Sequence, residues 1–123
     1  MGSCGVIIEY DGIQHFDLNP FFHKNDVDSF RNRKYYDILK HLVIISSKYR
    51  YKIIRIDYTA SSEEKVREHI LAKFATINFS YYSNPLMYSW IIAAEQEFFS
   101  KVTGMTWEQE MSLIQEMAMK YSA

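Results

Sequence analysis

The spacing of apolar residues in the first half of the chain predicts a strand followed by a long helix. Residues 6–10 form a short β-branched run that ends at the turn signal Asp11-Gly12, and this predicts a buried strand. A helix is expected to begin near Asp26 or Asp28, since acids are favourable at a helix N-terminus, and to end at the serine pair 46–47. Its apolar positions recur with the helical period at Tyr35, Ile38, Leu42 and Ile45.

Two further elements are predicted in the middle of the chain. Residues 51–56 (YKIIRI) predict a second strand, because they are rich in β-branched residues. Ser61 and Glu64 have the Ser-x-x-Glu spacing of a capping box, in which each side chain bonds a free backbone amide at the start of a helix. This signature predicts a helix that continues to about residue 74.

The last third of the chain is predicted to be mainly helical. Residues 76–83 form either a short strand or an aromatic loop. Pro85 predicts the first turn of a helix through residue 99, since proline is favoured at the first helical position. Thr106 and Gln109 form a second capping box, which predicts a final helix over residues 107–121.

The order strand–helix–strand places the two strands side by side and parallel, with a right-handed crossover. Two strands alone are marginal in water, because a stable sheet normally has three or more. Three solutions remain open: residues 76–82 add a strand, another chain completes the sheet, or a strand has been lost from the N-terminus. We predict a single α/β domain, with a βαβ core over residues 1–75 and a helical extension over residues 76–123 packed on it.

Composition limits the classes of protein to which the chain can belong. Apolar residues make up 48% of the 123 residues, enough for a core, and no run reaches the roughly 18 apolar residues of a membrane helix. The single cysteine, Cys4, excludes an internal disulfide and a cysteine-based zinc site. These features predict an intracellular protein with no membrane partner.

Charge is distributed unevenly along the chain. The net charge is −1, yet residues 31–55 carry eight basic side chains and a single acidic one, Asp37. Residues 1–28 carry five acids and one base. An acidic cluster beside a basic stretch suits a metal site next to a nucleic-acid backbone. Solvated basic faces of a helix and a strand would give the same pattern.

The end of the first predicted strand carries the most informative polar residues. Side chains alternate along a strand, so Glu9 and Asp11 project from the same side, where two carboxylates can share a divalent cation such as Mg²⁺. Gly12 permits a sharp turn, after which Gln14 and His15 can fold back toward a metal or a phosphate. His15 can also donate or accept a proton. A polar strand end with no ligand would show the same spacing.

The stretch IEYDGIQHF at residues 8–16 resembles the hallmark of a nuclease family. The Vsr-like (very-short-patch repair endonuclease-like) branch of the PD-(D/E)XK superfamily typically reads I-E-x-D-G-x-Q-H-F there. In that branch a helix with an Asp-x-x-Lys pair follows, and then a strand that ends in L-x-R-I-x-Y. This chain has DILK at residues 37–40 and IRIDY at residues 54–58, in the same order. The resemblance extends from residue 6 to about residue 74 and implies a restriction-endonuclease-like core, shortened at its N-terminus.

The resemblance also implies roles for residues of three segments. The implied catalytic residues are Glu9, Asp11, Gln14, His15 and Lys40. The implied nucleic-acid contacts are Arg33, Asp37, Lys40 and Arg55. Glu9 and Asp11 would hold Mg²⁺ or Mn²⁺, which would polarise the scissile phosphate and activate water. Lys40 or Arg55 would stabilise the charge that develops during phosphodiester hydrolysis in DNA.

One departure from the family concerns the metal shell. The family carries an Asp upstream of the Glu, in a segment like D-F-Y-L-P, and residues 1–8 of this chain contain no acid. Three interpretations follow: the site is degenerate, a partner chain supplies the missing strand, or another acid such as Asp57 substitutes. The resemblance thus implies a DNA endonuclease or its remnant. The alternative is a catalytically inactive nuclease fold that serves as a DNA-binding or structural subunit of a larger assembly.

The family also suggests where the protein acts. Members of this branch are frequent in large DNA viruses, phages and mobile elements. A viral protein in the cytoplasm or nucleus of a host cell, or in the virion, is therefore what the resemblance implies.

Overall fold

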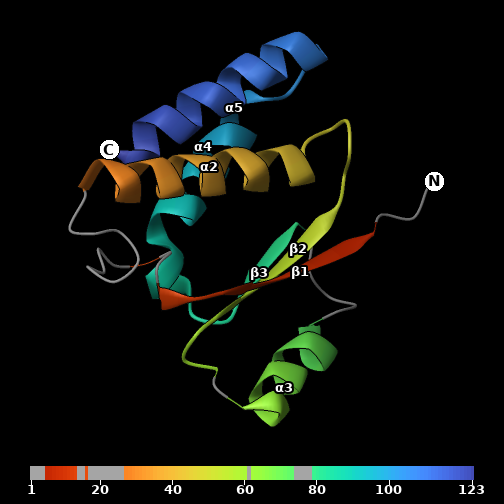
Figure 1. Cartoon of the computed structure of the whole chain (residues 1–123). Helices are drawn as coiled ribbons and strands as arrows, with labels where there is room; N and C mark the ends of the chain where they lie inside the picture. Colours follow the sequence, from red (N-terminus) through yellow and green to blue (C-terminus); the bar gives the residue numbers. More distant parts are fainter. Residues whose placement is uncertain (1–4, 14–15, 17–26, 61, 74–78) are drawn as a thin grey trace.

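A parallel sheet of three strands lies at the centre of an α/β structure (Figure 1). A computed structural model describes residues 5–13, 16, 27–60, 62–73 and 79–123. The strands are β1 (Val6–Asp11), β2 (Lys52–Asp57) and β3 (Ser80–Tyr82), in the order β1-β2-β3. The described helices are α2 (Val27–Ile45), α3 (Glu63–Lys73), the 3-10 helix η2 (Pro85–Tyr88), α4 (Ser89–Lys101) and α5 (Trp107–Ser122).

Strand β2 is central and pairs in parallel with both neighbours. Its register places Arg55 opposite Glu9 and Asp57 opposite Asp11. The predicted parallel β1–α2–β2 unit is therefore confirmed. Of the two alternatives for residues 76–83, the structure has a strand over Ser80–Tyr82, while residues 74–78 lie outside the described part. This strand supplies the third member that the sheet was expected to need.

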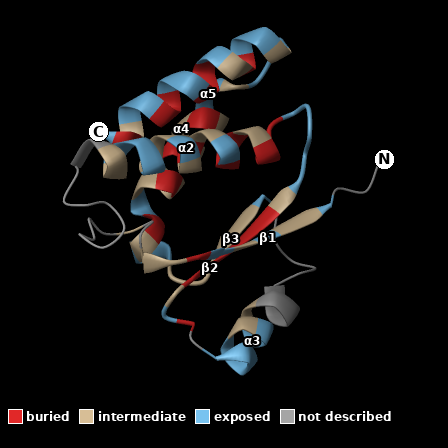
Figure 2. Cartoon of the chain, in the orientation of Figure 1, coloured by how far each residue is buried: buried red, intermediate tan, exposed pale blue. Residues whose placement is uncertain are grey.

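Helices α2 and α4 lie on one face of the sheet with α5 packed on them, and α3 lies on the opposite face (Figure 1). The buried side of the three packed helices forms a single core (Figure 2). Its fully buried members include Ile38, Leu42, Ile91, Phe98, Ile114 and Met117. On the other face Val66 of α3 packs against the buried Ile54 and Ile56 of β2. None of the helices described has the length and apolar character needed to cross a membrane.

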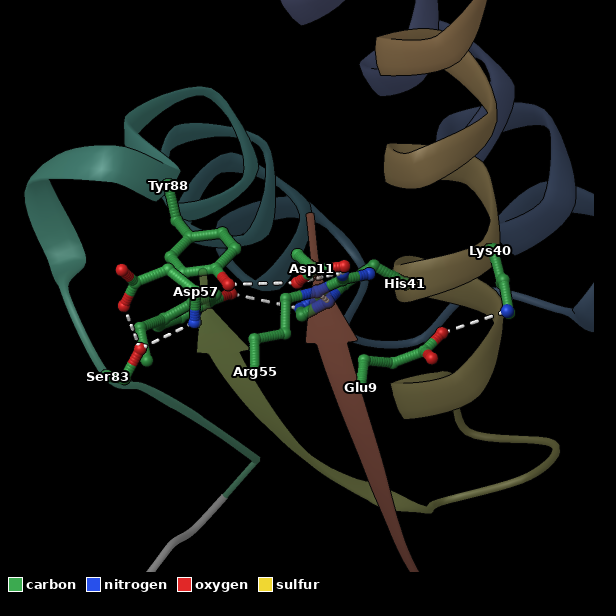
Figure 3. Close-up of polar contacts among 9 residues, drawn as sticks. Glu9, Asp11, Lys40, His41, Arg55, Asp57, Ser83 and Tyr88 are labelled. Carbon is green, nitrogen blue, oxygen red and sulfur yellow. Dashed lines mark hydrogen bonds and ion pairs between the residues drawn. The ribbon is translucent and has the colours of Figure 1, made fainter. Parts of the chain in front are cut away.

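Strand β1 differs from the buried strand predicted for residues 6–10. Alternation does place Glu9 and Asp11 on one side, and that side faces α2 (Figure 3). On the other side Ile8 and Tyr10 are 45% and 54% exposed, so the expectation of full burial is wrong. The physical reason is position: β1 is an outer strand, and the packing of α3 centres on β2.

The predicted helix boundaries hold to within a few residues, with local differences. Helix α2 ends at Ile45, directly before the serine pair that was expected to end it. At the start of α3 the Oγ of Ser62 accepts a hydrogen bond from the Lys65 N–H at 3.1 Å, whereas Ser61, the predicted cap, lies outside the described residues. Pro85 opens a 3-10 turn, and the α-helix itself begins at Ser89.

The capping box at the start of α5 is confirmed in both directions. The Gln109 N–H donates to the Thr106 hydroxyl at 3.2 Å, and the Thr106 N–H donates to the Gln109 side chain at 2.9 Å. We expect Thr106→Ala to lower the free energy of unfolding by about 1 kcal/mol, because the first turn of α5 loses the side-chain acceptor for one of its free amides. Urea denaturation followed by circular dichroism measures this. The exposed Thr103, outside the box, is the control, and an equal loss in Thr103→Ala would contradict the capping role.

Candidate functional site

A polar hollow of about 480 Å³ lies between β1 and α2. Its lining residues are Glu9, Tyr10, Asp11, Arg33, Tyr36, Asp37, Lys40 and Arg55. They include all six of the predicted site residues that the structure describes. The other two predicted residues, Gln14 and His15, lie outside the described part of the chain. We call this surface the polar hollow.

The fold brings these residues together for two reasons. Helix α2 presents Arg33, Asp37 and Lys40 at positions i, i+4 and i+7, which lie along one helical face. The parallel register of β1 and β2 places Arg55 directly across from Glu9. Because α2 connects the two strands, its polar face and the strand ends border the same hollow.

Glu9 and Lys40 form an ion pair at the open side of the polar hollow (Figure 3). The Lys40 ammonium lies 2.9 Å from a Glu9 carboxylate oxygen, and the two side chains are 64% and 27% exposed. A pair this accessible to water contributes between zero and about 1 kcal/mol to stability. Glu9 can therefore exchange Lys40 for another cation, and Lys40 can exchange Glu9 for an anion, at little cost.

Asp11 is held much more firmly than Glu9. The Arg55 guanidinium donates to both Asp11 oxygens, at 3.2 and 3.1 Å, and the Tyr88 hydroxyl donates to Oδ2 at 2.9 Å (Figure 3). Asp11 is 3% exposed and Arg55 is 2% exposed. Burial and the neighbouring Asp11 raise the pKa of Tyr88, so its hydroxyl keeps its proton and stays a donor. A ligand that approaches Asp11 must compete with Arg55.

The contacts of Arg55 continue into the core through His41. The Arg55 Nε–H donates to His41 Nδ1 at 2.9 Å, so Nδ1 carries no proton. The proton of the neutral imidazole is therefore on Nε2, which lies 2.8 Å from Oε1 of Glu95 and donates to it. His41 is fully buried, and burial lowers its pKa, which favours this neutral form.

Glu95 of α4 completes what we call the buried polar chain, Asp11–Arg55–His41–Glu95. Burial alone would raise the pKa of Glu95. The hydrogen bonds donated by His41, by Ser80 at 2.5 Å and by Tyr82 at 3.1 Å outweigh burial and lower it. The buried polar chain therefore contains two carboxylates with one guanidinium and one neutral imidazole between them.

The His41–Glu95 end of the buried polar chain was not predicted from the sequence. His41 is buried and has partners on both ring nitrogens, Glu95 at Nε2 and Arg55 at Nδ1. Glu95 was not singled out. A signal existed: Glu95 lies one turn from the buried Ile91 and Phe98, which places a carboxylate on the apolar face of α4.

Asp57 was named as a candidate replacement for the family's upstream Asp, and the structure gives its carboxylate other partners. Its Oδ1 accepts from the Ser83 hydroxyl, and its Oδ2 accepts from the N–H and the hydroxyl of Thr59 (Figure 3). Burial would raise the pKa of Asp57, but these donors outweigh it and lower the pKa. Asp57 thus fixes the turn after β2 and ties it to the segment after β3.

The donor set for a metal consists of two carboxylates. Within the described ranges there is no group of three or more His, Cys, Asp or Glu side chains that could hold a metal ion. Glu9 and Asp11 offer hard oxygen donors of the kind that Mg²⁺ takes, together with water and phosphate oxygens. Glu9 fits this use well, because its partner Lys40 is exposed and readily displaced.

Comparison with known proteins adds no family assignment. No protein-family model matches the chain, and no curated protein or solved structure matches it. The fold and the site define an α/β protein with a polar hollow beside the end of its first strand. The likeness to PD-(D/E)XK nucleases rests on the sequence motifs alone.

Proposed function

We propose that this chain is a metal-dependent DNA endonuclease of the PD-(D/E)XK type and that the polar hollow is its active site. One observation supports the proposal above all others: motif residues from β1, α2 and β2, far apart in sequence, line the same hollow. On this proposal the β1–α2–β2 unit is a restriction-endonuclease-like core, to which α4 and α5 are additions.

Each residue of the polar hollow has a role on this proposal. Glu9 and Asp11 would hold Mg²⁺ or Mn²⁺, which when bound would supply a Lewis acid and a water of lowered pKa. Lys40 would leave Glu9 and offset the charge on the phosphate. Arg33 would extend the cationic contact along the DNA backbone from the same face of α2.

Arg55 would act through Asp11 rather than on the phosphate directly. It is 2% exposed, its Nε donates to His41, and one terminal nitrogen donates to both Asp11 oxygens. Its role would be to hold the Asp11 carboxylate in a fixed orientation beside Glu9. Arg55 is thus a positioning residue on this proposal.

Cleavage of supercoiled plasmid tests the proposal. The wild type is expected to nick the plasmid with Mg²⁺ or Mn²⁺ and not with EDTA, and Glu9→Ala is expected to reduce the rate by roughly 100-fold or more, because a metal ligand is lost. The matched control is Glu63→Ala, which removes a carboxylate that is 88% exposed on α3. Glu63→Ala should cleave at the wild-type rate.

A second candidate function belongs to another class: a catalytically inactive nuclease fold that binds DNA or forms a structural subunit. It is favoured by the ion pairs, since Glu9 and Asp11 each already have a cation of the same chain as partner. In that case neither the wild type nor Glu9→Ala nicks DNA, although both are folded. Glu9→Ala should then bind DNA more tightly than the wild type, because it frees Lys40, and Lys40→Ala should bind more weakly. Folded protein that neither cleaves nor binds DNA would contradict the endonuclease and the DNA-binding role, and would leave the structural subunit.

A further inference from the structure

A second hollow, of about 410 Å³, lies at the other end of α2 and shares no residue with the polar hollow. Apolar side chains form most of its wall: Ile45, Phe79, Phe98, Phe99, Val102 and Met105. This volume falls within the range of about 300–1,000 Å³ that small-molecule pockets occupy. We call it the apolar hollow.

Two cations line the apolar hollow together with one buried acid. The cations are Arg50, in the connection from α2 to β2, and Lys52, the first residue of β2. The acid, Glu110, already accepts hydrogen bonds from the Ser47 N–H at 2.8 Å and from the Ser47 hydroxyl at 2.5 Å. Because these donors hold both Glu110 oxygens, the charges that line the hollow favour an anionic ligand.

The backbone at Arg50 is strained in a way that bears on this hollow. Arg50 has a φ of 55°, the left-handed region that disfavours residues with a Cβ atom. The turn is fixed there, because the Arg50 N–H donates to the Ser46 carbonyl at 2.8 Å and the Tyr51 N–H donates to the Ile44 carbonyl at 3.0 Å. An arginine kept where glycine is favoured is the kind of strained position that clusters at ligand sites.

We propose that the apolar hollow binds the carboxylate of a medium-chain fatty acid. The hydrocarbon body lies among Phe98, Phe99 and Val102. The Nε of Arg50 donates to the Ser47 carbonyl at 3.0 Å, and the carboxylate pairs with the two terminal nitrogens of the guanidinium, which can form two parallel hydrogen bonds to it. Burial of the chain supplies affinity, and Arg50 selects the anionic head over a neutral one. This proposal does not depend on the endonuclease proposal, since the two hollows are separate.

Isothermal titration calorimetry with three probes tests the carboxylate and the hydrocarbon body of the ligand separately. Octanoate should bind at least tenfold more tightly than 1-octanol, which has the same body without the charge. Acetate, which has the charge without the body, should show no binding. Equal affinity for octanoate and 1-octanol would overturn the role of Arg50, and detectable acetate binding would overturn the role of the apolar wall.

Substitutions of residues that line the apolar hollow test whether octanoate binds there. Arg50→Gly should lower octanoate affinity to that of 1-octanol while the melting temperature of the free protein stays the same or rises, because glycine relieves the positive φ. Val102→Phe should weaken both ligands by filling the space. Lys65→Ala, which removes an exposed cation of α3, should change neither.

Two results would contradict the proposal. Octanoate binding that survives Arg50→Gly places the carboxylate elsewhere, and binding that survives Val102→Phe places the hydrocarbon elsewhere. Should Arg50→Gly fail to fold, Arg50→Asn repeats the test, since asparagine also tolerates the left-handed conformation and has no charge.

Discussion

Replacement of Arg55 by methionine is expected to lower the free energy of unfolding by about 3–5 kcal/mol, because it leaves a buried carboxylate without its cation. Arg55 and Asp11 are 2% and 3% exposed, so water does not replace the lost contact. The substitution also removes the donor to Nδ1 of His41. Methionine keeps a similar volume, so the loss reports on polar contacts more than on a cavity. Urea denaturation at pH 7 measures the difference.

A matched control and a double variant separate this effect from a general effect of arginine loss. Arg67 pairs with Glu63 on the surface of α3, where the side chains are 65% and 88% exposed. Arg67→Met should change stability by no more than about 0.5 kcal/mol. The double replacement of Asp11 by leucine and Arg55 by methionine should recover part of the loss, because no buried charge is left alone. A loss below about 1 kcal/mol in Arg55→Met would contradict the buried ion pair.

The second large effect concerns pH. The free energy of unfolding is expected to fall in two stages as the solution is acidified. The pKa of His41 is lowered from its usual 6.5 in the folded protein. Its contribution is therefore complete above pH 6.5 and is lost as the pH falls from 6.5 toward the folded-state pKa. The pKa of Glu95 is lowered from 4.5, so its contribution is lost only as the pH falls below 4.5.

The first stage should have a slope of at most about 1.4 kcal/mol per pH unit, the value for uptake of one proton on unfolding. Unfolding free energies measured at intervals between pH 7.5 and 3.5 provide the curve. His41→Gln, which keeps an amide donor but cannot titrate, should lose the slope between pH 6.5 and 5 even though its overall stability is lower. His69→Gln, which removes a histidine of α3 outside the buried polar chain, should retain the slope. A flat wild-type curve between pH 6.5 and 5 would show that His41 is not held neutral by burial.

The elements of the fold were predictable where short-range rules decide the structure. The capping box of Thr106 and Gln109 is a contact across three residues, and it placed the start of α5 correctly. The helical period of Ile38, Leu42 and Ile45 identified the buried face of α2. Strand β2 begins and ends one residue later than the predicted range 51–56. Its ends depend on pairing with β1 and β3, which lie elsewhere in the chain.

The sequence was enough to predict which residues line the candidate site, but not which of them contact one another. Strand alternation and helical spacing place Glu9 and Lys40 at the same hollow, and that is as far as short-range rules reach. Whether Asp11 faces a ligand or a guanidinium depends on Arg55, 44 residues away, and on Tyr88, 77 residues away. Exposure of Ile8 was unpredictable for a related reason, since it depends on which element covers the outer strand.

The packing of α5 on α2 has a consequence for how the protein is made in the cell. Residues Leu113, Ile114 and Met117 of α5 share a core with Ile38 and Leu42 of α2. A ribosome produces α2 and all three strands before it produces α5, because synthesis runs from the N-terminus. The nascent chain therefore exposes the apolar stripe of α2 until α5 has emerged. A pause in translation within the α5 codons would prolong the exposure of that stripe to chaperones and proteases.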